Sequence, residues 1–120
     1  VPTAALRREE AAQAALQVKA LGRKPLNDGL SMDRNDNIFI TDVEHGSIMK
    51  MTPAGLLSTV VQDMQRLRWA DALSFGPDGW LYVADSALPD QLLRSKSHMR
   101  EQAPYRIFRF KPGTEGVPGQ

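Results

Sequence analysis

The sequence predicts an all-β protein that contains two tandem copies of one β-meander unit. Residues 28–42 and residues 71–85 align without a gap at an offset of 43 residues. In both copies, two short apolar stretches typical of strands flank a cluster of Pro, Asn, Asp or Gly residues, which is typical of a tight hairpin. A four-stranded unit that recurs every ~40–45 residues has the spacing of β-propeller blades.

The two copies agree in residue identity as well as in pattern. Four aligned pairs are identical: Asp28/Asp71, Leu30/Leu73, Ser31/Ser74 and Asp42/Asp85. Four more pairs keep an apolar side chain: Met32/Phe75, Ile38/Leu81, Phe39/Tyr82 and Ile40/Val83. A separate β-sandwich would fit the number of strands but not a gapless recurrence, so the repeat favours a propeller.

Further strands complete each unit. Residues 47–53 and 106–112 alternate apolar and polar side chains, which predicts a half-buried third strand in each copy. Residues 56–62 predict a fourth, outer strand for the first unit. Residues 16–22 lie 43 residues before residues 59–65 and are expected to form the outer strand of a preceding unit. The expected total of eight strands corresponds to about two four-stranded antiparallel blades.

We divide residues 1–120 into three parts of one partial propeller. Residues 3–16 are rich in Ala, Glu and Arg, with Thr3 as N-cap, and predict a short helical connector. Residues 17–70 form the first blade region and residues 71–120 the second. Within the second region, an insertion at residues 86–104 separates the second strand from the third.

Composition narrows the classes of partner and chemistry. The chain has no cysteine, and 15 Lys and Arg against 14 Asp and Glu leave a formal net charge of +1. Disulfides, thiolate metal sites and cysteine nucleophiles are therefore excluded. Such a balance of charge gives no reason to expect a nucleic-acid or membrane partner. No apolar stretch approaches the ~20 residues of a membrane-spanning helix.

Several spaced segments resemble bacterial members of the major royal jelly protein/Yellow family. They are Val1–Arg7, Lys24-Pro25, Asp28–Asp33, Asn37–His45, Gln62-Asp63, Arg66–Asp71 and Pro104–Arg109. The resemblance implies a six-bladed propeller in a superfamily shared with regucalcin and gluconolactonases, and a secreted or periplasmic location. Members of the family include pigment-pathway proteins, amine binders and nutritional proteins.

The chain is short for that family. Six blades need roughly twice its 120 residues. We therefore expect either a fragment of a longer protein or a homo-oligomer. In a trimer, three chains would supply six blades, and residues 16–22 of one chain would complete the final blade of its neighbour.

The repeat also indicates a ligand site. In a propeller, loops that lead into the innermost strands lie at one mouth of the central channel. Asn27-Asp28 and Ala70-Asp71 occupy equivalent positions in two such loops. We predict that Asn27, Trp69 and Asp71 contact a small molecule there, with the Trp69 ring stacked on an aromatic or amine ligand. The insertion is expected to form a partial lid.

The resemblance also implies a metal alternative. In the regucalcin and gluconolactonase relatives, Asn-Asp-Gly and Pro-Asp-Gly segments at this place provide metal-ligating Asn and Asp. Residues 27–29 match the first pattern, whereas residues 70–72 keep only the Asp. Asn27 and Asp71 would then hold a divalent cation such as Ca²⁺, the ion of a metal-dependent lactone hydrolase. A non-catalytic interaction scaffold is the third alternative, and no catalytic residue is assigned.

Other polar and aromatic residues have structural interpretations. Asp28 is expected to stabilise its own turn, and Asp42 and Asp85 to accept hydrogen bonds in the turns that follow them. His45 either pairs with a carboxylate as a pH-sensitive site or is solvated. Trp80 and Tyr82 lie on one face of an alternating strand and are expected in the core between blades.

Overall fold

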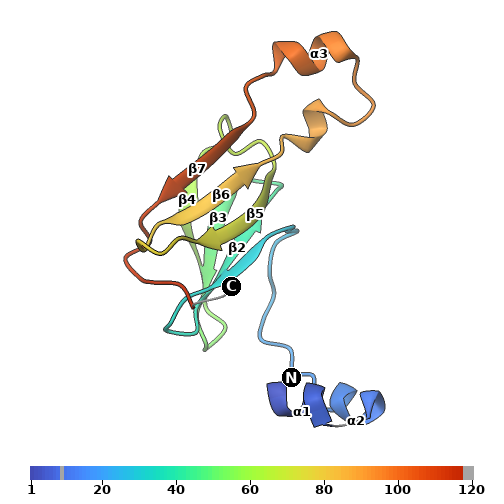
Figure 1. Cartoon of the computed structure of the whole chain (residues 1–120), viewed down its shortest axis with the longest axis vertical. Helices are drawn as coiled ribbons and strands as arrows, with labels where there is room; N and C mark the ends of the chain where they lie inside the picture. The colour runs from blue at the N-terminus through green and yellow to red at the C-terminus, as the bar shows by residue number, and fades with distance from the viewer. Residues whose placement is uncertain (9, 118–120) are drawn as a thin grey trace.

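The chain folds into two antiparallel sheets with few helices, so the all-β prediction is confirmed (Figure 1). The computed structural model describes residues 1–8 and 10–117. The four-stranded sheet has the order β1 (Leu30–Met32), β2 (Ile38–Asp42), β3 (Ser47–Met51), β4 (Leu57–Gln62). The three-stranded sheet has the order β5 (Ala70–Phe75), β6 (Leu81–Asp85), β7 (Arg106–Phe110).

Both predicted hairpin turns form at the Asp- and Gly-rich clusters. In the turn between β1 and β2, the buried Asp33 carboxylate accepts hydrogen bonds from the backbone N–H groups of Asn35 (2.9 Å) and Asn37 (2.8 Å). In the turn between β5 and β6, Gly79 adopts a φ of 73°, which glycine takes without steric cost. These local interactions set the register of each hairpin.

The two sheets pack face to face around one core. Phe39 and Ile48 of the four-stranded sheet lie against Leu81 and Val83 of the three-stranded sheet. The rings of Phe39 and Phe75 meet edge-on, with centroids 5.5 Å apart. This apolar contact places the start of β5 beside the start of β1, where the candidate site lies.

Equivalent repeat positions lie on equivalent faces of the two sheets but differ in burial. Ile48 is 0% exposed, whereas its counterpart Ile107 is 74% exposed. Phe39 is buried, whereas its counterpart Tyr82 is half-buried. Tyr82 does not lie in the core between these two sheets, because alternation in β6 directs Leu81 to that core and Tyr82 to the opposite face. Its place in a core between blades stays a prediction.

Trp80 shares that outer side with Tyr82 and is also absent from the core between the sheets. The Arg109 guanidinium lies over both rings, 4.4 Å from the centroid of Trp80 and 6.0 Å from that of Tyr82. The Lys111 ammonium lies 5.3 Å from the Trp80 centroid. Cation–π contacts therefore take the place that apolar packing was expected to take.

Residues 16–22 do not form the predicted strand, and the described residues contain seven strands in place of eight. Leu16 is 80% exposed and Val18 is 65% exposed. The segment instead passes the turn after β3: a Cβ atom added to Gly55 would lie 2.6 Å from the Leu21 carbonyl oxygen. The reason is that an outer strand must pair with the third strand of its own unit, and for this segment that strand belongs to a preceding unit.

The predicted N-terminal helix is divided into α1 (Thr3–Arg8) and α2 (Ala11–Ala15). Residue 9 lies between them, outside the described residues. Thr3 begins α1 and is not its N-cap, because the Pro2 carbonyl accepts the first helical hydrogen bond, from the Ala5 N–H at 3.0 Å. No helix within residues 1–8 and 10–117 is long and apolar enough to cross a membrane.

A long segment separates β6 from β7, at the place of the predicted insertion. It contains a 3₁₀ helix, η1 (Leu88–Asp90), and α3 (Lys96–Glu101). In Figure 1 it extends beyond the end of the three-stranded sheet. The corresponding residues of the first unit, 43–46, form only a tight turn between β2 and β3.

Candidate functional site

The two loops predicted to meet at a channel mouth do lie together. A Cβ atom added to Gly29 would lie 2.4 Å from the Asp71 carbonyl oxygen, so only glycine permits this backbone approach. The Trp69 indole N–H donates a hydrogen bond of 2.5 Å to the Asp28 carboxylate. The start of β5 and the loop before β1 therefore form one site, which we call the junction site: Asn27, Asp28, Trp69 and Asp71.

Thr41 holds the loop before β1 in place. Its buried hydroxyl oxygen accepts hydrogen bonds from the backbone N–H groups of Asp28 (3.2 Å) and Gly29 (3.0 Å). The turn-stabilising role predicted for Asp28 thus belongs to Thr41, and the Asp28 carboxylate binds Trp69. Sequence reasoning missed Thr41 because its repeat counterpart is Ala84, so the repeat drew no attention to a hydroxyl at that position.

The junction site contains two exposed carboxylates and an aromatic side chain, and one of the carboxylates, that of Asp28, contacts the indole N–H. Asp28 and Asp71 are exposed, and Trp69 is half-buried. Within the part of the chain that the structure describes, the Asp71 carboxylate has no hydrogen-bond or ion-pair partner. The site therefore presents negative charge next to an aromatic side chain, an arrangement that attracts cations.

Asn27 lies beside this pair but is already engaged. Its side-chain amide donates to the Gly29 carbonyl at 3.4 Å, and its side-chain oxygen accepts a hydrogen bond from the Lys24 ammonium. The Lys24 ammonium thus binds the amide oxygen of Asn27, which in the metal alternative would be a ligand of the divalent cation. Nothing in the repeat pointed to Lys24.

The residues of the junction site do not fit a divalent cation. Calcium takes six to eight oxygen ligands, whereas the described residues contain no group of three or more His, Cys, Asp or Glu side chains that could hold a metal ion. The Asn27 oxygen faces Lys24 and one Asp28 oxygen faces an indole N–H. The metal ligands Asn27 and Asp71 therefore stay a prediction without geometric support, and we derive no chemistry from a bound ion.

Asp42 and Asp85 occupy equivalent positions but bind different partners. Asp42 accepts hydrogen bonds from the N–H groups of Glu44 and His45, both at 3.2 Å, which confirms its role in the turn. The Asp85 carboxylate instead accepts a hydrogen bond from the backbone N–H of Trp69, at 2.6 Å. The insertion explains the difference, because it removes the tight turn whose N–H groups Asp85 would have bound.

Arg68 attaches the insertion to the body of the protein. Its guanidinium lies 3.5 Å from the buried Asp85 carboxylate and 3.0 Å from that of Asp90 in η1. It also donates to the Gln102 carbonyl at 3.0 Å and lies 5.6 Å from the centre of the Tyr105 ring. Two neighbouring residues therefore connect different parts of the protein. Trp69 contacts the loop before β1, and Arg68 contacts the insertion.

The insertion begins at the junction site but its function as a lid stays a prediction. The N–H of Ser86 donates to the Trp69 carbonyl at 3.0 Å. Beyond that point, His98 of α3 pairs with Asp90 at 3.3 Å. In Figure 1, η1 and α3 lie beyond the end of β6 and β7.

His45 forms the carboxylate pair that the sequence suggested. Its Nδ1 lies 3.0 Å from an Asp42 oxygen. The imidazole is 65% exposed, whereas the Asp42 side chain is buried. The pair sits in the turn between β2 and β3, and neither residue belongs to the junction site.

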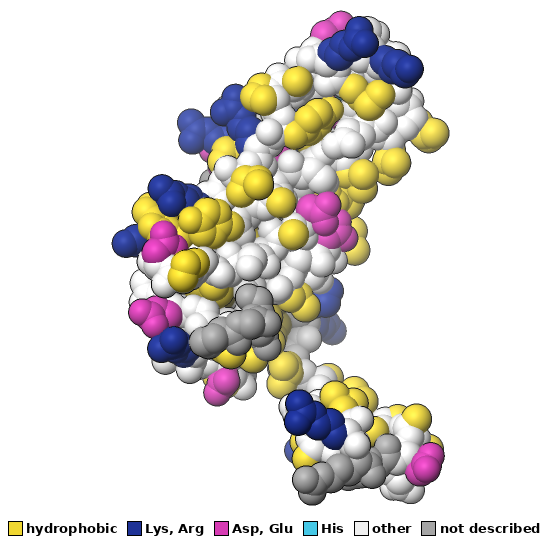
Figure 2. All heavy atoms as spheres, viewed as in Figure 1, with side chains coloured by type: hydrophobic (Ala, Val, Ile, Leu, Met, Phe, Trp, Pro, Cys, Tyr) yellow, Lys and Arg dark blue, Asp and Glu magenta, His cyan; other side chains and the backbone are white. Residues whose placement is uncertain are grey.

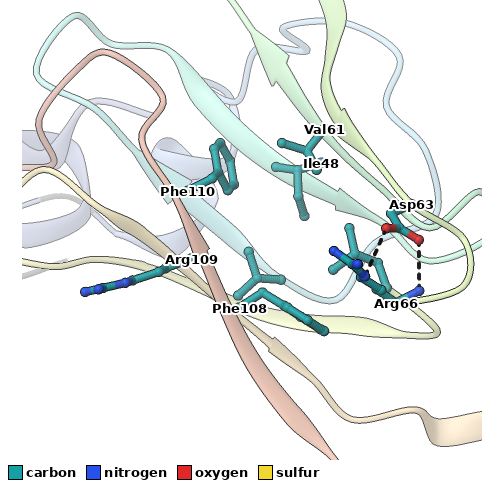
Figure 3. A pocket seen from close by; sticks show the side chains of 9 residues that line it. Ile48, Val61, Asp63, Arg66, Phe108, Arg109 and Phe110 are labelled. Carbon is teal, nitrogen blue, oxygen red and sulfur yellow. Dashed lines mark hydrogen bonds and ion pairs between the residues drawn. The ribbon is translucent and has the colours of Figure 1, made fainter.

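A separate apolar cavity of about 160 Å³ opens between the outer strands of the two sheets (Figure 3). The Arg66–Asp63 ion pair lies at one side of the cavity. The apolar lining comes from both sheets and the loop before β5: Ile48, Val61, Leu67, Val83, Phe108 and Phe110. None of the predicted ligand residues Asn27, Trp69 and Asp71 lines it. The cavity lies where β4 of one sheet faces β7 of the other and the second sheet has no fourth strand.

No model of a protein family matches the chain, and no curated protein matches it. The resemblance to the royal jelly/Yellow family therefore stays a prediction based on the segments quoted above.

On the face shown in Figure 2, hydrophobic, basic and acidic side chains are interspersed over the sheets.

Proposed function

We propose that this chain forms two neighbouring blades of a six-bladed propeller of the royal jelly/Yellow type, which binds a small organic amine at the mouth of its channel. The 43-residue repeat and the equivalent faces of the two sheets support the propeller. The family resemblance supports an exported protein. The amine is supported by the charge and aromatic character of the junction site.

The hydrogen bond between Trp69 and Asp28 carries the proposal. An indole has one polar hydrogen, and here Asp28 already accepts it. What Trp69 offers a ligand is therefore the face of its ring, which attracts a cation and stacks on an aromatic ring. The exposed Asp71 carboxylate supplies the counter-charge from the loop that touches Gly29. A ligand with an ammonium group and an aromatic ring satisfies both groups.

Titration calorimetry with tyramine tests the site. We expect measurable binding that weakens about tenfold in Asp71→Asn, since a charge-assisted contact contributes ~1.5–3 kcal/mol, and that weakens as salt increases. Glu101→Gln is the matched control, because it removes one exposed carboxylate from α3. Equal affinity in wild type and Asp71→Asn would contradict the proposal, as would a loss in Glu101→Gln of the same size.

A calcium titration tests the lactone-hydrolase alternative separately. A Ca²⁺-dependent rise in melting temperature that disappears in both Asn27→Ala and Asp71→Ala would support metal binding. We expect no such rise, because the two side chains do not form a ligand set with a third acidic or His side chain among the described residues.

A further inference from the structure

The outer face of the three-stranded sheet carries the repeat counterparts of interface residues but is only partly covered. Tyr82, Ala84 and Ile107 lie on this face. Their repeat counterparts, Phe39, Thr41 and Ile48, are all buried. In the first unit this face is covered by the second unit. In the second unit no described residue takes that place for Ile107, which is 74% exposed.

The four-stranded sheet carries the complementary face. Leu30 and Ile38 are the repeat counterparts of Leu73 and Leu81, which pack against the first sheet. Leu30 is 54% exposed, whereas Leu73 is 8% exposed. Other residues of this face, Ile40 and Met51, are buried, and Gly22 lies close to Met51. The chain therefore contains one complete interface between its two units, and parts of each half of the same interface stay exposed on their outer sides.

The outer edge of β7 is also unpaired within the described residues. Residues 114–117 do not add a strand there, because they pass to the first sheet, where Gly116 forms a bridge with Asp33. Residues 16–22 match the repeat position of a fourth strand, although the described part of the chain does not form a strand there. A free strand edge is the usual site for pairing with another chain.

We infer that copies of this chain associate head to tail. The four-stranded sheet of one copy covers the outer face of the three-stranded sheet of the next, and residues 16–22 add a fourth strand to β7. The existing contact between the two units serves as the template, so the same kinds of side chain meet across both interfaces. A head-to-tail interface closes into a ring or continues as a fibre. Three copies close the ring, and this number alone rests on the six blades of the proposed function.

The internal repeat predicts the register of the new strand pair. Ile48 pairs with Val61 in the first unit, so Ile107 of one copy pairs with Val18 of the other. Ser47 pairs with Gln62, so Arg106 meets Lys19. Like charges on paired strands oppose association. Lys19→Glu is therefore expected to strengthen association roughly two- to fivefold.

Light scattering on the 120-residue chain tests the association. We expect a mass of three chains for wild type, falling to one chain in Ile107→Asp. The unfolding midpoint of dilute Ile107→Asp should stay near that of wild type, because the side chain is exposed within one copy. Leu93→Asp is the matched control, since it adds the same charge at an exposed leucine of the insertion and should leave the trimer intact.

A cross-link tests the register. The chain has no cysteine, so a Val18→Cys/Ile107→Cys double variant has only these two thiols, at a pair whose expected spacing suits a disulfide. Mild oxidation should link copies into species of up to three chains. Val18→Cys/Leu93→Cys should not give this ladder. A folded wild type with the mass of one chain, or a double variant that forms no link between copies, would overturn the inference.

Discussion

The four-stranded and three-stranded sheets come from the same repeat, but they hold equivalent residues in different environments. Ile48 lies in the core, whereas Ile107 is largely exposed. Asp42 binds the N–H groups of its own turn, whereas Asp85 binds Trp69 and Arg68. The comparison teaches that a repeat preserves local pairing, whereas burial depends on which neighbour covers each face.

The insertion is the second source of difference between the sheets. In the first unit, the chain turns directly from β2 into β3. In the second, residues 86–105 intervene, and Asp85 is released from turn formation to hold the loop at the junction site. One added segment therefore changes the role of a residue that is identical in both units.

The largest expected effect separates Ile48 from Ile107. Ile48→Ala should lower the free energy of unfolding by about 3 kcal/mol, because it leaves a cavity in a buried core. Ile107→Ala should change it by less than about 0.5 kcal/mol in dilute protein. Urea unfolding followed by tryptophan fluorescence measures both. Equal losses would show that the two faces are equally covered.

The second-largest expected effect is a difference in the free energy of unfolding between variants of Asp85 and Asp42. Asp85→Ala should cost about 3 kcal/mol, because it leaves Arg68 without its most buried partner and the Trp69 N–H without an acceptor. Asp42→Ala should cost about 1 kcal/mol, since it removes hydrogen bonds within one turn and its ionic partner, His45, is largely exposed. Asp85→Asn keeps an acceptor for Trp69 and should fall between them. The same urea experiment ranks all three, and the reverse order would refute this account of the insertion.

Gly29 and its repeat counterpart Ala72 differ in the space around them. Gly29→Ala should cost about 2 kcal/mol, because the new Cβ would meet the Asp71 carbonyl oxygen. Ala72→Gly, at an exposed position of β5, should cost less than about 1 kcal/mol. Thermal unfolding compares the two variants. A neutral Gly29→Ala would mean that the two loops lie further apart.

The smallest expected effect is a pH dependence that comes from Asp33 in the first hairpin turn. Burial raises the pKa of Asp33, but hydrogen bonds from the side chain and backbone of Asn37 and the backbone of Asn35 outweigh it, so the pKa lies below its usual 3.8. The stabilisation is therefore fully present above pH 3.8 and is lost as the pH falls through the lower, folded-state pKa.

The counterpart of Asp33 in the second unit is Gly76, which does not titrate. Asp33→Asn should lose less stability than wild type when urea midpoints at pH 6 and pH 3 are compared. An identical fall in both proteins would remove Asp33 as the cause.

Local patterns predicted the strands and hairpin turns well, because period-two alternation and turn residues act within a few neighbours. All strands of residues 28–62 and 71–110 lie where the pattern indicated. The strand expected at residues 16–22 was wrong because a strand requires a partner, and local sequence does not say whether that partner is present. Alternation placed Trp80 and Tyr82 on one face of their strand, but it did not show that this face points away from the core between the two sheets.

The residues of the candidate site were likewise predicted only in part. The repeat located Asn27 and Asp71, since equivalent loops enter equivalent strands. It did not reveal Thr41 or Arg68, whose partners lie far along the chain. It did not reveal Lys24 either, which lies outside the aligned segments and binds Asn27.

The sequence by itself determined the repeat, the antiparallel strand pairs, the turns and the place of the insertion, because these depend on short-range alternation and backbone preference. Only the tertiary structure decided that Trp69 donates to Asp28, that Asp85 leaves its turn to bind Trp69, and which copy of each repeated face is buried. Those outcomes depend on contacts between units, where desolvation and packing act across residues that no local pattern connects.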